Sequence, residues 1–268
     1  MNGTVAQLAA LACHGNAHLK NGGVPSFFPS NSTCKFCDEI SFVVFKRSFF
    51  GKVKEKEIAS TPDDWFEYLT GKNAKSLKLA YSPQSSSATD DRMSAGFVGG
   101  GGRWGIEVLL PNDKSEYWVA RWQVWNQNAP ERRIWRVTYA MVSTGKTPRD
   151  GALPIRNVTD ALERSLEEIH SFSERNNCGG FTEAFAKALD TLRSGNKHGY
   201  HQDISRDGLL SKEAELILDA CQSASVFGGM GSWNDMGFDG AEQAEYERVS
   251  DQLFCYINNA IVAAVNSA

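Results

Sequence analysis

The sequence lacks any apolar run long enough to form a membrane-spanning helix. None of its hydrophobic stretches approaches the roughly 20 residues that cross a bilayer. The apolar segment from Met1 to Cys13 has no basic residue before it, which makes it a poor secretory signal. We therefore expect a protein without a membrane span and without an export signal.

Catalytic signatures are also missing. The chain contains no G-x-S-x-G elbow, no H-E-x-x-H helix and no G-x-x-x-x-G-K-[ST] phosphate loop. These absences exclude the common motif-based assignments of serine hydrolases, zinc proteases and P-loop nucleotide hydrolases. No residue can therefore be given a catalytic role from sequence alone, and the catalytic residues stay unknown. No internal repeat is visible either.

Cysteines are few for the length, with six in 268 residues. Without an export signal, this number predicts reduced thiols and a cytoplasmic location. Four residues nevertheless have zinc-like spacing, because a Cys-x2-Cys pair follows an upstream Cys and His. A structural zinc would use Cys13, His18, Cys34 and Cys37, with His14 competing for the place of His18. The alternative interpretation is a set of buried thiols and surface histidines.

Composition is that of an ordinary globular protein, with 41% hydrophobic and 22% charged residues. The net charge of -4 hides an asymmetry between the two halves. Up to Ile155 there are 19 Lys and Arg against 14 Asp and Glu, whereas the rest has 9 against 18. A basic half packed beside an acidic half explains this pattern, and the alternative is a basic half that meets an anion or a nucleic acid.

The clearest pattern in the chain is a β-hairpin from Tyr117 to Val142. In its first strand, Trp118, Ala120, Trp122 and Val124 alternate with mostly polar residues, as a half-buried strand requires. A turn-forming segment follows at residues 126–130, and a second β-rich run completes the hairpin. Four of the seven tryptophans lie in this region. We expect a sheet centred on it.

The remaining patterns predict an α+β fold. Strands are expected near residues 40, 77, 106, 121 and 137, which gives a mostly antiparallel sheet of about five strands. After the breakers that follow residue 145, the period changes to that of helices, and about four helices are expected to pack on one face of the sheet. The sheet-rich half covers residues 1–150 and the helical half covers residues 151–268, as one integrated unit.

A glycine run precedes the strand near residue 106. Glycines let backbone amides approach a ligand closely, and a neighbouring cation could hold a phosphate or a carboxylate. The run therefore predicts a small anionic ligand at Gly99, Gly100 and Arg103. The alternative is a hairpin tip or a bulged sheet edge.

The second glycine-rich loop, residues 227–240, carries aromatic side chains and a carboxylate. As a pocket wall, Trp233 and Phe238 would stack on a flat ligand while Asp235 fixes its polar edge, and Asn234 is expected among the ligand-binding residues. The alternative is a helix connection whose aromatics plug the core. His198 and His201 offer acid-base groups, although polar loops often contain such residues by chance.

Three functions compete on these grounds. The first is a binding or regulatory protein whose glycine and aromatic loops contact a small anionic ligand or a partner protein. The second is an enzyme, of hydrolase or transferase type, that uses Asp235, His198 or His201 in a cleft between sheet and helices. The third is a nucleic-acid-binding protein that uses the basic N-terminal half.

Overall fold

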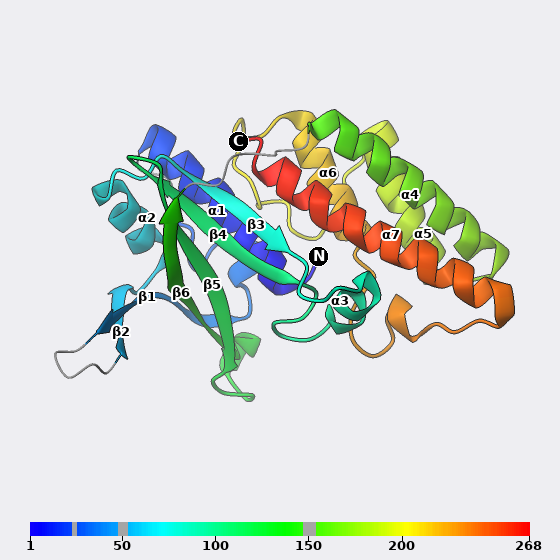
Figure 1. Cartoon of the computed structure of the whole chain (residues 1–268), viewed down its shortest axis with the longest axis horizontal. Coiled ribbons are helices and arrows are strands. Elements are labelled where there is room, and N and C mark those ends of the chain that lie inside the picture. Colours follow the sequence, from blue (N-terminus) through cyan, green and yellow to red (C-terminus); the bar gives the residue numbers. More distant parts are fainter. Residues whose placement is uncertain (23–25, 48–52, 147–153) are drawn as a thin grey trace.

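The fold is built on one six-stranded sheet, described by a computed structural model for residues 1–22, 26–47, 53–146 and 154–268 (Figure 1). The strands lie in the order β2-β1-β6-β5-β4-β3. Their bounds are β1 (Cys37–Arg47), β2 (Val53–Ala59), β3 (Ser76–Ser82), β4 (Arg103–Leu110), β5 (Lys114–Val124) and β6 (Trp135–Lys146).

The sheet is mixed, because β1 pairs with β6 in parallel while the other neighbours are antiparallel. The expectation of about five mostly antiparallel strands is therefore correct only in part. The strand that sequence reasoning missed is β2, an edge strand whose Lys and Glu residues are mostly exposed. Such a strand has no apolar face to reveal it, although charge on an edge strand is common because it discourages pairing with other chains.

The predicted hairpin is confirmed as β5 and β6. Its buried face packs around Trp118, which is fully buried and lies 5.4 Å from the Trp65 ring of a helix. Phe42 of β1 stacks between Trp65 and Tyr139, with ring centroids 4.5 Å and 5.2 Å apart. This aromatic cluster forms the centre of the sheet core.

Seven α-helices lie in the described residues, more than the sequence indicated. They are α1 (Gly3–Asn21), α2 (Pro62–Gly71), α3 (Ala88–Ser94), α4 (Ile155–Arg175), α5 (Gly180–Ser194), α6 (Lys212–Ala224) and α7 (Gly240–Val265). The four helices expected in the C-terminal half are α4 to α7. The polar, serine-rich composition of residues 82–91 predicts an exposed loop, but the short helix α3 begins within this segment.

The helices that cover the sheet are α1 and α2, not the C-terminal ones. α1 contacts β3 and β4, and α2 contacts β1 and β2, so both lie on one face. α4 to α7 pack mainly on one another, and α7 meets the sheet at β3 (Figure 1). The expected packing of the C-terminal helices across a sheet face is therefore wrong, because α1 occupies that face with side chains buried along most of its length.

The outer edge of β3 is closed by two asparagine side chains. Asn16 of α1 donates to the carbonyl oxygen of Leu77 and accepts from its N–H, at 2.8 Å and 2.7 Å. Asn266, directly after α7, makes the same pair of bonds with Leu79, at 2.9 Å and 2.8 Å. Each amide thus replaces one residue of a neighbouring strand and ties a helix to the sheet.

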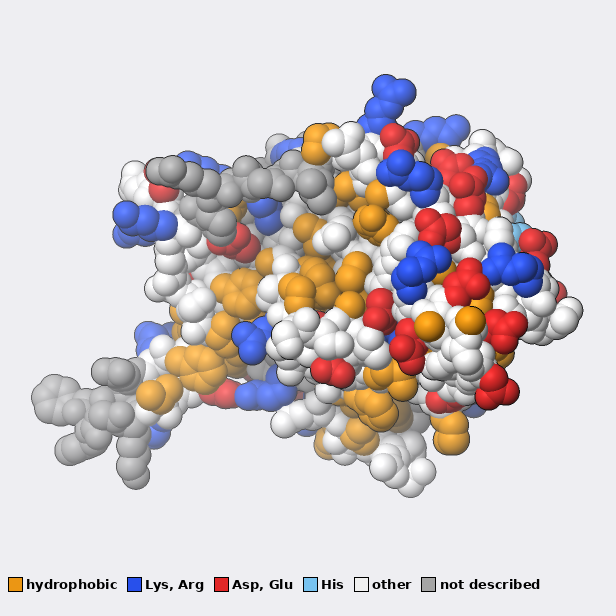
Figure 2. All heavy atoms as spheres, turned by 45° about the vertical axis from the view of Figure 1, so that its right-hand side comes forward, with side chains coloured by type: hydrophobic (Ala, Val, Ile, Leu, Met, Phe, Trp, Pro, Cys, Tyr) orange, Lys and Arg blue, Asp and Glu red, His pale blue; other side chains and the backbone are white. Residues whose placement is uncertain are grey.

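The helical part of the molecule exposes charged side chains of both signs (Figure 2). Figure 2 shows the helical side carrying many acidic and basic side chains, while hydrophobic side chains gather between it and the sheet. Ion pairs join helix to helix, including Arg193 with Glu163 and Arg248 with Glu168.

Among the helices that the structure describes, none combines the length and hydropathy of a bilayer crossing. The boundary expected at residues 150–151 lies outside the described residues.

Candidate functional site

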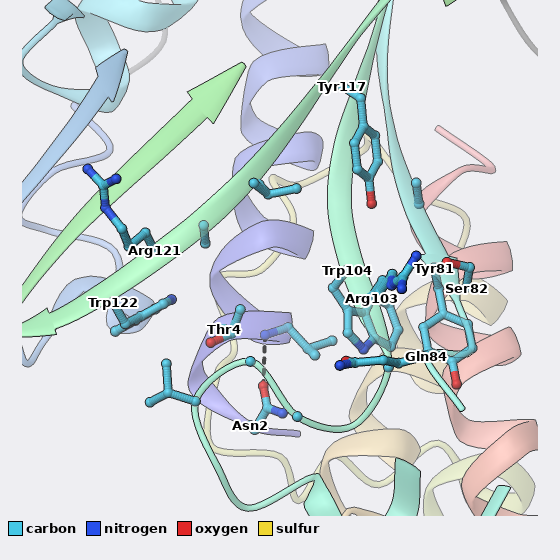
Figure 3. A pocket seen from close by; sticks show the side chains of 18 of the residues that line it. Asn2, Thr4, Tyr81, Ser82, Gln84, Arg103, Trp104, Tyr117, Arg121 and Trp122 are labelled. Atoms are coloured by element: carbon cyan, nitrogen blue, oxygen red, sulfur yellow. Dashed lines mark hydrogen bonds between the residues drawn. The ribbon is translucent and has the colours of Figure 1, made fainter. Parts of the chain in front are cut away.

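The candidate site is a gap inside the sheet, where β4 and β5 separate. Their ladder includes the pair Ile106 and Trp118, and extending the same register would pair Trp104 with Ala120 and then Gly102 with Trp122. The described ladder contains neither pair, although both strands continue beyond Ile106 and Trp118. Figure 3 shows the two strands diverging, with α1 crossing behind the gap.

The gap opens into a cavity of about 1000 Å³. Its floor is the start of α1 and the loop of residues 95–100, and its walls are the facing parts of β3, β4, β5 and β6. This volume is at the upper end of the range for small-molecule sites. The lining includes the side chains of Tyr81, Gln84, Arg103, Trp104, Glu107, Tyr117, Val119, Arg121, Trp122 and Lys146.

Glycines shape the floor of the cavity. Gly99, Gly101 and Gly102 have φ angles of +81°, +80° and +96°, which L side chains rarely adopt. The resulting turn is held by Ser94, whose hydroxyl accepts the N–H of Gly101 at 3.1 Å. Gly96 packs directly against the backbone of Gly228 and Gly229, so the two glycine-rich loops touch each other.

Aromatic rings form much of the wall. Tyr81 and Trp104 lie 4.5 Å apart at their centroids, on the β3 and β4 side. On the other side, Trp122 meets Trp135 edge to face at 5.8 Å. The buried indole N–H of Trp122 has no hydrogen-bond partner in the described structure, and Figure 3 shows the nitrogen turned toward α1. These rings offer flat apolar surface to a ligand.

Two arginines of the cavity lining differ in their availability. Arg121 forms a bidentate ion pair with Glu55 of β2, at 2.8 Å and 3.0 Å, and points away from the gap in Figure 3. The side chain of Arg103, which is exposed at the start of β4, has no hydrogen bond or ion pair with another described residue. Its guanidinium therefore has five N–H donors open to a ligand.

Tyr117 lies beside Arg103 on the open side of the sheet (Figure 3). Burial raises the pKa of Tyr117, and the nearby Glu107 raises this pKa further, while Arg103 opposes both. The phenol therefore stays protonated at neutral pH and keeps an O–H to donate. No other described residue is hydrogen-bonded to this hydroxyl.

Three of the predicted ligand-binding residues lie at this cavity. Gly99, Gly100 and Arg103 are all part of its lining. The amide of Gly100 donates to Phe97 at 3.0 Å, so this N–H is already used inside the loop. The glycine run therefore lies at the cavity, its role in ligand binding stays a prediction, and the donor group left open beside it is the Arg103 side chain.

The other three predicted residues point elsewhere. Trp233 is fully buried among Phe181, Phe185 and Tyr246, and its N–H donates to Ser250 at 2.7 Å. Asn234 accepts a hydrogen bond from Arg92 at 2.9 Å. Asp235 is exposed and accepts the N–H of Gly231 in its own loop. The structure therefore does not bring these residues to the cavity.

The proposed zinc ligands do not form a shared site. Cys13, Cys34 and Cys37 are buried thiols, and burial raises the pKa of Cys13 to about 12 and that of Cys37 to about 11. His18 lies 3.4 Å from Glu67, between the Nε2 and Oε1 atoms. Within the described ranges no three His, Cys, Asp or Glu side chains gather as metal ligands. This arrangement gives the zinc prediction no support.

The two loop histidines also lie outside the cavity. His201 Nδ1 is 2.7 Å from the Ser32 hydroxyl. The carboxylate of Asp203 accepts hydrogen bonds from the N–H and from the hydroxyl of Ser32. His198 Nε2 is 2.9 Å from Asp190. These contacts fasten the loop of residues 197–207 to the segment before β1 and to α5.

The residues that sequence reasoning missed are Trp104, Ala120 and Trp122 as parts of a cavity wall. Each was expected in a strand, but a strand pattern does not show that two neighbours separate. The one local signal was the glycine run directly before β4.

Compared with known proteins, the chain matches no family model, no curated protein and no solved structure.

Proposed function

We propose that this chain is a binding protein whose cavity between β4 and β5 takes a small ligand with an apolar body and one anionic group. The observation that carries the proposal is Arg103, a guanidinium without an intramolecular partner in the described structure, at the edge of a cavity walled by aromatic rings. A planar guanidinium binds carboxylate or phosphate oxygens through two parallel hydrogen bonds.

The shape of the cavity supports an apolar body next to that anion. Trp104, Trp122 and Val119 supply apolar surface on the two strands that border the gap. Burying ligand surface there contributes roughly 25 cal/mol per Å² of apolar area. The neutral hydroxyl of Tyr117 adds a donor beside the guanidinium, and Gln84 adds an amide.

The competing functions remain predictions from the sequence. The cavity does offer titratable groups, because Tyr117 and Glu107 lie in its wall. The histidines and the aspartate that an enzyme was expected to use are not in that wall. Nucleic-acid binding by the basic half stays a prediction as well, and it is tested by the salt dependence of affinity.

The test is a calorimetric titration of the full chain with dodecanoate and with dodecanol. These probes share the apolar body and differ in the anionic group. We expect dodecanoate to bind more tightly, and Arg103→Gln to weaken its binding about ten- to hundredfold, since a hydrogen bond to a charged group contributes about 1.5–3 kcal/mol. Dodecanol binding should be unchanged in the same variant.

Arg164→Gln is the matched control, because Arg164 is an exposed arginine of α4 away from the cavity lining. This variant should bind both probes as the wild type does. Equal loss of dodecanoate affinity in the two variants, or no binding of either probe to the wild type, would contradict the proposed function.

A further inference from the structure

The edge of β5 that faces the gap carries unpaired main-chain groups. Trp125, directly after β5, donates its N–H to Ile134 on the β6 side, at 2.9 Å. In a strand, successive residues turn their N–H and C=O groups to opposite edges. The alternation therefore turns the amides and carbonyls of Ala120 and Trp122 toward β4, where the ladder has ended.

The facing edge of β4 has the same property. Lys75 donates its N–H to Leu109 at 2.7 Å, which shows that Leu109 faces β3. By the same alternation, Trp104 turns its N–H and C=O toward β5. Trp104, Ala120 and Trp122 all line the cavity, so both of its strand walls present donors and acceptors without a ladder partner.

The gap differs in this respect from the outer edge of β3. At the outer edge of β3, two asparagines supply the bonds that a further strand would make. Inside the gap, no corresponding side chain of the described residues is hydrogen-bonded to Ala120 or Trp122. Each hydrogen bond that a ligand makes to such a main-chain group contributes about 0.5–1.5 kcal/mol of net stabilising free energy.

We infer that the ligand of this cavity is an extended peptide segment that enters between β4 and β5 as an additional strand. The inference rests on the proposed function and names its ligand class. Main-chain hydrogen bonds give affinity in such strand addition, and alternate side chains give specificity.

The two faces of the gap define the side chains that fit. Ala120 and Trp122 belong to the face that α1 covers, so alternate residues of the peptide meet an apolar floor. Arg103 and Tyr117 lie on the open face, so the residues in between meet a cation and a neutral donor. The matching peptide therefore alternates apolar and acidic residues.

The experiment uses acetyl-Val-Glu-Val-Glu-Val-amide and the same peptide with both glutamate nitrogens methylated. Methylation removes two amide donors but keeps every side chain and carbonyl. Binding to the full chain is followed by calorimetry and by tryptophan fluorescence. We expect the parent peptide to bind and to displace dodecanoate, and methylation to weaken its affinity about tenfold or more, as the loss of two hydrogen bonds predicts.

A variant pair tests the same bonds from the protein side. Ala120→Pro removes the N–H that faces the gap and leaves the bonds between β5 and β6 in place. Ala120→Gly removes the side chain but keeps that N–H. Proline should weaken the peptide about three- to tenfold relative to glycine, as one lost hydrogen bond predicts, while dodecanoate binding should respond equally to both.

The outcomes separate the two proposals. If dodecanoate binds through Arg103 but the peptide does not, or if methylation changes nothing, the peptide inference is overturned and the proposed function stands. If neither probe binds, both are overturned. If the parent peptide displaces bound dodecanoate and methylation weakens the peptide, both proposals stand.

Discussion

At the residue scale, Gly105 determines how the open face of the sheet is arranged. A Cβ atom at this position would lie 2.6 Å from the carbonyl oxygen of Trp118 and 2.6 Å from the ring of Tyr117. Only glycine lets the phenol lie across β4, close to Arg103. The absence of a side chain therefore positions the neutral donor of the candidate site.

Replacing this glycine should be costly. Gly105→Ala is expected to lower the free energy of unfolding by about 1–3 kcal/mol, because the added methyl group overlaps rigid backbone. Gly145→Ala in β6 is the control, since a Cβ there meets nothing within 4 Å, and it should cost little or slightly stabilise the strand. Equal unfolding midpoints for the two variants in urea would show that the close approach is unimportant.

At the element scale, the loop of residues 227–240 acts as a plug for the helical part. Trp233 inserts its ring among the aromatic side chains of α4, α5 and α7, and both Ser250 and Tyr246 bond to this residue. The glycines of the loop allow the chain to turn closely around that ring. Its richness in glycine and aromatics thus has a packing explanation.

Removal of the plug should destabilise the fold. Trp233→Ala is expected to cost about 3–5 kcal/mol, the usual range for deleting a buried tryptophan. Trp125→Ala provides a comparison, because this ring is 49% exposed and its main contact is the guanidinium of Arg136 at 3.8 Å, worth about 0.5–1 kcal/mol. A Trp233 variant as stable as the Trp125 variant in chemical denaturation would refute the core role.

At the scale of the whole molecule, the loop of residues 197–207 fastens the helical half to the sheet half through groups that respond to pH. His14 of α1 is bonded through Nε2 to the carbonyl oxygen of Asp203 at 2.9 Å. Burial lowers the pKa of His14, with the Asp203 carbonyl acting in the opposite direction and Arg206 adding to the decrease. Burial also lowers the pKa of His201 in the same loop.

These shifts predict a loss of stability in mild acid. The folded pKa of His14 lies below the ordinary value of 6.5, so the unfolded chain binds more protons between the two values. The contribution of neutral His14 to the free energy of unfolding is complete above pH 6.5, and it is lost as the pH falls through the folded pKa. His14→Gln should therefore show a smaller decrease in unfolding free energy than the wild type when urea titrations are compared between neutral and mildly acidic pH. Identical pH profiles would contradict this assignment.

The sequence predicted those parts of the fold in which the local pattern and the tertiary environment agree. The alternation around Trp118 identified β5, and the change to a helical period after the breakers identified α4. β2 was missed because its run of alternating Lys and Glu has no apolar face. α3 was missed because the segment is polar and is held by an ion pair between the buried Arg92 and the partly exposed Asp251. The gap could not be predicted, because both strands keep their pattern where they separate.

The closed edge of β3 and the open gap have opposite effects on how this chain can associate. A peptide that joins the outside of a sheet creates a new free edge, from which further chains can add in sequence. A strand held between β4 and β5 would have both of its sides occupied at once. Association at this position would therefore stop at one guest for each host, and growth into fibres could not start there.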